Sequence, residues 1–230
     1  DCGSMDEIHG CNRKAIDLQR GLVIFRLEAG ARVGLGHLTR DAAVACSLAV
    51  DGWRCAFAVS AESHDLVAAQ VDDIGEVRSL ASSDSAASAL RRHWPEGCDW
   101  LVVDCYAVDD AFERECRGWA RRIAVFEDMP NRRHDCDLLV DPTLGRLGAE
   151  YGALTPARTM HLCGVDYASL DDEFRRRRVA GTAARRRDPP AAERRLFVCF
   201  GGGDTTEILV RLLGALGEAK FPWPVDVAAV

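Results

Sequence analysis

Short apolar runs alternate with amphipathic stretches along most of the chain. The runs predict strands over 22–26, 53–59, 76–80, 99–104, 122–127, 137–141 and 159–163. Between them, apolar positions at helical spacing predict helices over 37–50, 63–72, 84–94 and 108–120, and a charged helix over 170–178. Such alternation is typical of βα units wound into a parallel sheet with right-handed crossovers. The pattern therefore predicts an α/β fold.

Changes in composition divide the chain. Residues 1–20 are polar without a clear period and predict a tail, whereas 21–185 form the expected N-terminal domain. Residues 186–195 are rich in Ala, Arg and Pro, which is linker composition.

A second unit is expected over 196–230. It consists of an apolar strand at 196–200, a glycine turn at 201–203, a helix with apolar residues on one face and a final strand at 225–230. This order repeats the strand, glycine turn and helix of the first unit. A strand at a terminus normally needs a covering element, so we expect 196–230 to be the beginning of a second domain, incomplete in this sequence.

The turn after the first strand is the strongest candidate site. Gly34 and Gly36 can adopt positive φ and let a ligand approach the backbone, and the following helix presents unpaired N–H groups that favour an anion. His37, expected to face solvent at the start of this helix, lies where positive potential keeps an imidazole neutral, as a general base requires. The alternative is a tight turn in which His37 merely caps or packs.

Two further clusters follow predicted strands. Asp104 and Tyr106 come at the end of the 99–104 strand, either facing a ligand or serving as a helix cap and a rim aromatic. Residues 126–137 gather carboxylates, Asn131, Arg132 and His134 in a loop too polar for a core, although solvated loops also have this composition. The Gly201–Asp204 turn resembles a phosphate-binding turn but lacks the Lys-Ser/Thr of a P-loop.

Composition narrows the function classes. The net charge of −7 argues against a nucleic-acid partner, and the arginine runs near 175–195 are typical of solvated helix and linker. The ten cysteines include no C-x-x-C pair and no histidine at finger spacing, so no zinc site is expected. Several lie in apolar runs and indicate reduced thiols of a cytoplasmic protein. Neither a signal peptide nor an apolar run of membrane-spanning length is visible.

In combination the motifs resemble a known family. The ordered string is Arg26-Leu27-Glu28-Ala29-Gly30, Gly34-Leu35-Gly36-His37-Leu38-Thr39-Arg40, Asp104-Cys105-Tyr106, Glu127-Asp128 with Asn131–Leu139, Gly164–Leu170 and Phe200–Asp204. It is similar, over about residues 21 to 220, to UDP-2,4-diacetamido-2,4,6-trideoxy-β-L-altropyranose hydrolases of pseudaminic acid biosynthesis, with the spore-coat polysaccharide protein SpsG as a relative. Glu28, Cys105 and Asp141-Pro142-Thr143 depart from the family pattern, which leaves the identity of the sugar open.

The resemblance implies a GT-B architecture, with a UDP-activated amino sugar between two Rossmann-like domains, and no metal or other cofactor. The family's C-terminal glycine-rich segment, which holds most of the nucleotide, lies beyond Val230, so the 230 residues alone could be inactive. Water would attack the anomeric carbon with loss of UDP and inversion, and His37 would be the base. The resemblance places Arg26, Gly34, Gly36, Asp104, Tyr106, Asn131, Arg132, Gly202 and Gly203 at the substrate.

Two alternatives stay open. A glycosyltransferase of the same fold would use a sugar or lipid hydroxyl in place of water, and fold cannot decide between them. A degenerate sugar-nucleotide binding protein would have lost catalysis. We expect a monomer without a nucleic-acid partner or a membrane span.

Overall fold

The computed structural model of the chain describes residues 20–80, 86–181, 194–201 and 204–228. The predicted tail up to residue 19, most of the predicted linker, Gly202 and Gly203 lie outside the described residues.

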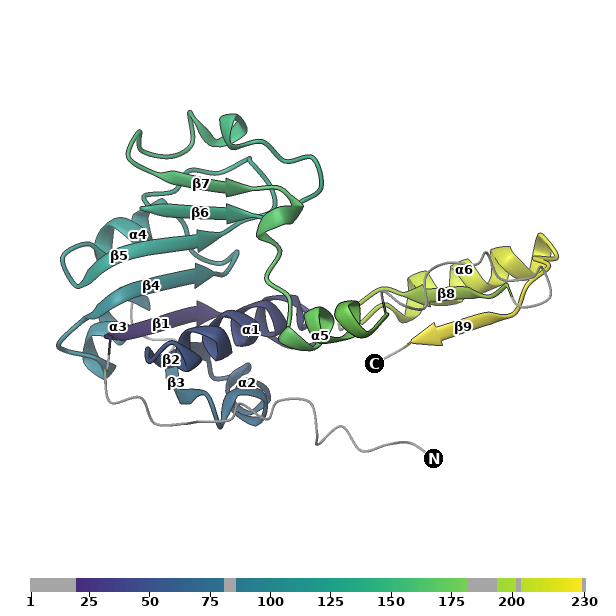
Figure 1. Cartoon of the computed structure of the whole chain (residues 1–230), viewed down its shortest axis with the longest axis horizontal. Coiled ribbons are helices and arrows are strands. Elements are labelled where there is room, and N and C mark those ends of the chain that lie inside the picture. The colour runs from purple at the N-terminus through teal and green to yellow at the C-terminus, as the bar shows by residue number, and fades with distance from the viewer. Residues whose placement is uncertain (1–19, 81–85, 182–193, 202–203, 229–230) are drawn as a thin grey trace.

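A seven-stranded parallel sheet forms the centre of the N-terminal part (Figure 1). Its strands are β1 (Leu22–Leu27), β2 (Arg54–Ser60), β3 (Gly75–Leu80), β4 (Cys98–Asp104), β5 (Ala120–Phe126), β6 (Leu138–Asp141) and β7 (Met160–Cys163). They are arranged in the order β3-β2-β1-β4-β5-β6-β7, and every neighbouring pair is parallel. The first six strands have the order of the Rossmann fold. The predicted α/β class and its Rossmann-like parallel sheet are confirmed.

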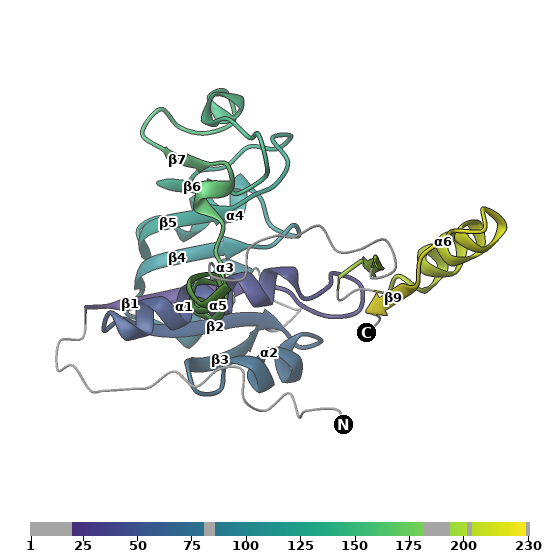
Figure 2. The same ribbon diagram turned by 45° about the vertical axis from the view of Figure 1, so that its right-hand side comes forward.

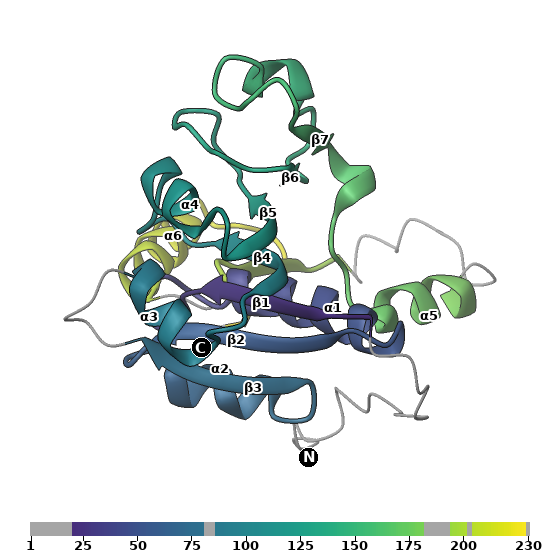
Figure 3. The ribbon, with the colours of Figure 1, turned by 90° about the vertical axis from the view of Figure 1, so that its left-hand side faces the viewer.

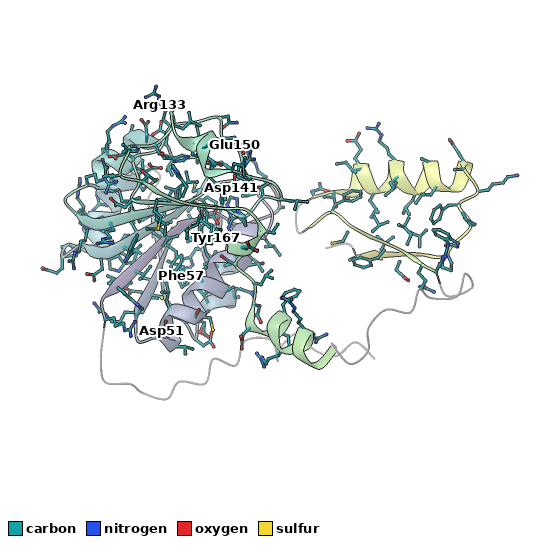
Figure 4. The ribbon with its side chains drawn as sticks, turned by 45° about the horizontal axis from the view of Figure 1, so that its top comes forward. Asp51, Phe57, Arg133, Asp141, Glu150 and Tyr167 are labelled. Carbon is teal, nitrogen blue, oxygen red and sulfur yellow. The ribbon has the colours of Figure 1, made fainter. Side chains whose placement is uncertain are left out.

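Helices cover both faces of the sheet, because both faces of each central strand are apolar. Helices α1 (Gly36–Val50) and α2 (His64–Val71) pack on one face, and α3 (Ala86–His93) and α4 (Asp110–Cys116) pack on the other (Figure 3). On the first face Phe25 and Phe57 stack with ring centroids 5.3 Å apart, and Figure 4 shows Phe57 in the middle of the domain. On the second face Ile24 packs in the cluster that contains Leu90 and Phe112.

The elements match the expected ranges to within a few residues, with one clear difference. The predicted helix 108–120 is wrong in its last turn, since α4 ends at Cys116 and β5 already begins at Ala120. Arg117 has an extended ψ of 141° and Gly118 a φ of +82°, which is the left-handed region that favours glycine. The chain therefore turns here rather than continuing the helix.

After β7 the chain forms the short turn η3 (Val165–Tyr167) and helix α5 (Asp172–Gly181). Between β6 and β7 lies another short turn, η2 (Gly148–Tyr151).

The C-terminal residues form a strand, a helix and a second strand, all three labelled in Figure 1, and Figure 2 shows α6 and β9 from another side. These are β8 (Leu196–Cys199), α6 (Thr206–Glu218) and β9 (Val225–Ala228), and β8 pairs with β9 in parallel. Val198 is the one buried residue among those described in this segment. No helix in the described parts of the chain is both long and apolar enough to cross a membrane.

Candidate functional site

The candidate site lies where the strand order reverses. From β1 the chain crosses to β2 on one side, and from β4 it crosses to β5 on the other, although β1 and β4 are neighbours. Open parallel sheets bind ligands at the carboxyl ends of the strands at such a point. His37 follows β1, Asp104 ends β4 and Tyr106 comes two residues later. The topology therefore brings together three residues that are far apart in the sequence.

The loop between β1 and α1 is closed by two glycines. The N–H groups of Gly30 and Gly34 donate to the carbonyls of Gly34 and Gly30, at 3.1 and 2.7 Å. Positive φ occurs at Gly30 (+147°) and Gly34 (+86°). The expectation of positive φ at Gly36 is wrong, because Gly36 is the first residue of α1. A Cβ added at Gly36 would meet nothing within 4 Å, so open space lies beside it. Leu35, the N-cap, makes no side-chain capping bond.

A buried ionic cluster anchors this loop to the sheet. Arg26 is 6% exposed and bonds Glu28 at 2.6 Å. Ser60 and Ser63 both donate to Glu28, at 2.5 and 2.7 Å, and Ser63 also accepts from the backbone N–H of Ala29. Burial raises the pKa of Glu28, but the charge of Arg26 and the serine hydrogen bonds outweigh it and lower the pKa overall. Arg26 lies inside this cluster, and its role toward substrate stays a prediction.

His37 is buried rather than exposed to solvent, with an exposed fraction of 8%. Its Nδ1 lies 3.7 Å from Oδ1 of Asp104, and its ring meets that of Tyr106 edge-on at 5.0 Å between centroids. Nδ1 is itself buried and has no hydrogen-bond partner among the described residues. The expectation of a solvent-facing histidine is therefore wrong, because α1 packs its first turn against the end of β4.

Asp104 is also held by Arg40. The guanidinium donates through Nε to Oδ2 at 2.8 Å and through Nη2 to Oδ1 at 2.5 Å, and it also stacks 4.8 Å above the ring of Phe126. Such a two-point pair fixes the carboxylate plane. Asp104 is 2% exposed, so it is oriented within the site and does not cap α4, which Asp109 caps.

Asp41 is a site residue that sequence reasoning missed. Its exposed fraction is 0%. Burial, followed by the charge of Asp104, raises its pKa well above the usual aspartate range. The sequence did contain a signal, because Asp41 stands at helical spacing between Leu38 and Ala45, on the face of α1 that packs into the core.

Tyr106 and Arg132 form the rim next to this cluster. Tyr106 is 48% exposed and its hydroxyl donates to Asp128. Arg132 lies 5.5 Å from the Tyr106 ring and donates to the carbonyl of Val108 at 2.8 Å. Burial and the hydrogen bond to Asp128 raise the pKa of Tyr106, so it stays a neutral donor. Asn131 is exposed, and none of the hydrogen bonds found among the described residues joins it to His37 or Tyr106.

Below this rim lies a buried ionic cluster centred on His134. Its ring bonds Glu113 through Nδ1 at 2.7 Å and Glu127 through Nε2 at 3.0 Å, and Glu127 in turn bonds Arg132 at 2.5 Å. Burial lowers the pKa of His134, but the two carboxylates outweigh it and raise the pKa to about 9. Hydrogen bonds from His134, the Asp128 N–H and Arg132 overcome the burial of Glu127 and lower its pKa to about 2. Glu113 is the second residue that the sequence analysis missed.

Two other observations concern possible metal ligands and a surface depression. No group of three or more His, Cys, Asp or Glu residues in the described part of the chain is placed to hold a metal ion. An open depression of about 640 Å³ is lined by residues such as Gly21, Arg54 and Arg117, at the amino ends of the strands, and so lies at the sheet edge opposite His37.

Comparison with known proteins shows a sequence similarity to a hydrolase of a UDP-sugar. Over 200 residues the chain is 23% identical to the UDP-2,4-diacetamido-2,4,6-trideoxy-β-L-altropyranose hydrolase of Campylobacter jejuni, which covers 86% of this chain and 67% of the relative. The resemblance indicated by the motifs is confirmed. No family model matches the chain. Among solved structures, AibC aligns with 91% of this chain at 13% identity and a TM-score of 0.39, and this chain spans about half (49%) of the length of AibC.

Proposed function

We propose that this chain takes part in the hydrolysis of a UDP-activated diacetamido-trideoxyhexose, in the biosynthesis of a pseudaminic acid-type sugar or a surface polysaccharide. The observation that carries the proposal is the placement of His37 beside Asp104 and Tyr106 at the point of strand reversal. The similarity to the Campylobacter jejuni hydrolase supports the substrate class.

His37 would be the general base. Its Nδ1 faces Asp104, so a proton on Nδ1 leaves the lone pair of Nε2 to accept the proton of a water molecule. That water would attack the anomeric carbon on the face opposite the leaving group, which gives inversion. The water oxygen bonds to carbon, the bond from that carbon to the phosphate oxygen breaks, and UDP leaves with the electron pair.

The leaving group needs stabilisation of negative charge rather than a strong acid. The first turn of α1 offers backbone N–H groups beside the open space at Gly36. We propose that Gly34 and Gly36 allow the substrate to approach here, and that Asp104 and Tyr106 orient the sugar. Asn131 and Arg132 would act at the rim, and Arg26 would act toward the substrate from its ionic cluster with Glu28. Gly202 and Gly203, which lie outside the described residues, would also bind the substrate.

The domain division is also a proposal. Residues 21–185 would form one Rossmann-like domain and 196–230 part of a second, joined by 186–195 in a GT-B arrangement. The strand-helix-strand order of β8, α6 and β9 supports it. A cytoplasmic, monomeric state stays a prediction.

The test is UDP release by the complete gene product that contains these residues. UDP-2,4-diacetamido-2,4,6-trideoxyhexoses are incubated with and without sugar or lipid acceptors, and both UDP and free sugar are measured. We expect UDP and free sugar in equal amounts without an acceptor. Release of UDP only in the presence of an acceptor would contradict the proposal and indicate a glycosyltransferase. Binding of the sugar nucleotide without release of UDP would indicate a non-catalytic binding protein.

A further inference from the structure

Asp41 is a buried titratable group that the proposed mechanism does not use. It lies one helical turn after His37 on α1, and both of its carboxylate oxygens are inaccessible to solvent. No N–H or O–H donor of the described residues reaches either oxygen by a regular hydrogen bond. A fully buried carboxylate without a donor is unfavourable unless it is neutral.

The charges around Asp41 make ionisation still less favourable. The group that it faces is Asp104 on β4, and the nearby cation is Arg40 on its own helix. The Arg40 hydrogen bonds go to both oxygens of Asp104 and not to Asp41. If both carboxyl groups were ionised, two buried negative charges would share one cation. A single proton between the two carboxyl groups removes this repulsion, as in other buried carboxyl pairs.

We propose that Asp41 is a positioning residue that carries a proton and donates it in a hydrogen bond to Asp104. Arg40 and Asp41 then hold Asp104 from two directions and keep Oδ1 directed at Nδ1 of His37, 3.7 Å away. Because both of its carboxylate oxygens are buried, Asp41 acts only through Asp104. The inference rests on the proposed role of His37, but the protonated state of Asp41 is testable without any substrate.

The first experiment observes that proton directly. The full chain is labelled with 13C at the aspartate carboxyl carbon, and the signal of Asp41 is assigned from its loss in the Asp41→Asn variant. We expect a protonated carboxyl signal for Asp41 at about pH 7. An ionised signal at this pH overturns the inference.

The second experiment uses two variants of matched shape. Asparagine keeps a neutral donor at the position, whereas leucine keeps the branched outline and removes the donor. In Asp41→Leu, Asp104 loses a donor and attracts the proton on His37 more strongly. The apparent pKa on the acid side of the pH profile of kcat/KM should therefore rise by about half a pH unit to one pH unit, and kcat should fall. In Asp41→Asn this apparent pKa should equal that of the wild type, and kcat/KM should be close to the wild-type value.

The outcomes separate the alternatives. Equal shifts in both variants mean that the charge of Asp41 matters rather than its donor, and unchanged profiles in both mean a structural role alone. If Asp41→Leu does not fold, the asparagine variant and the carboxyl signal still show whether Asp41 carries a proton. If the wild-type protein releases no UDP, the proposed function fails, whereas the carboxyl signal continues to test Asp41.

Discussion

Replacement of His37 by glutamine tests the chemistry of the site with little disturbance of its packing. Glutamine keeps a polar side chain of similar length but cannot accept the proton of a water molecule. Loss of a general base lowers the rate by about 10²–10⁴-fold, or roughly 3–5 kcal/mol of transition-state stabilisation. The loss should appear mainly in kcat. UDP release under saturating sugar nucleotide measures it.

Burial of His37 makes the choice of substitution important. His37 is 8% exposed and its ring packs against Tyr106, so His37→Ala should also lower the free energy of unfolding by about 1–3 kcal/mol. Thermal melting of each variant separates this effect from catalysis. His64→Gln is the matched control, because His64 also begins a helix after a strand but is only partly buried and is paired with Asp65. Near-wild-type turnover by a folded His37→Gln protein would refute the assignment of His37 as the base.

Contacts elsewhere in the structure support four more predictions. Gly36→Ala should leave the melting temperature unchanged, because a Cβ there meets open space, but should raise KM; an unchanged KM would remove Gly36 from the site. Tyr106→Phe should lose one hydrogen bond, worth about 1 kcal/mol in kcat/KM, with little change in melting; the reverse pattern would make Tyr106 structural. The His134 cluster should contribute most to unfolding free energy between about pH 4.5 and 6.5. With folded pKa values of about 9 for His134 and about 2 for Glu127, the contribution of the cluster falls as the pH rises toward 9 or drops toward 2. Urea titrations measure the free energies of unfolding of the wild type and of His134→Gln, and a difference between them that stays constant across this pH range would contradict the prediction. Backbone amides of 196–228 should exchange with deuterium much faster than those of the central strands, because only Val198 is buried there among the described residues; comparable protection would show that this segment is as stable as the sheet.

Periodicity in the sequence predicted the strands and helices because it reports which positions are apolar, and burial of apolar positions determines this sheet. Both faces of β1 are buried, which the apolar run of Leu22–Phe25 already indicated. The end of α4 was missed because Arg117 and Trp119 are compatible with a helix, and Gly118 ends it through a backbone angle that composition does not specify. Turn residues thus limit how accurately the ends of helices can be predicted from the sequence.

The site was predictable only in part. The βα turn and the end of β4 were found because glycines, a histidine and a carboxylate follow apolar strands there. Asp41 and Glu113 were missed because each lies on the packed face of its helix, where an isolated sequence shows a polar residue but not its partner. The burial of His37 was also missed, since it depends on the contact between α1 and β4, which only the folded chain provides.

The most direct test of the account is the source of the oxygen in the released sugar. The complete gene product is incubated with a UDP-2,4-diacetamido-2,4,6-trideoxyhexose in water enriched in 18O, and the sugar and UDP are analysed by mass spectrometry. We expect one 18O atom at the anomeric position of the free sugar and none in UDP, with labelled sugar formed about 10²–10⁴-fold more slowly by His37→Gln. Label in UDP, or release of UDP by His37→Gln at the wild-type rate, would contradict it.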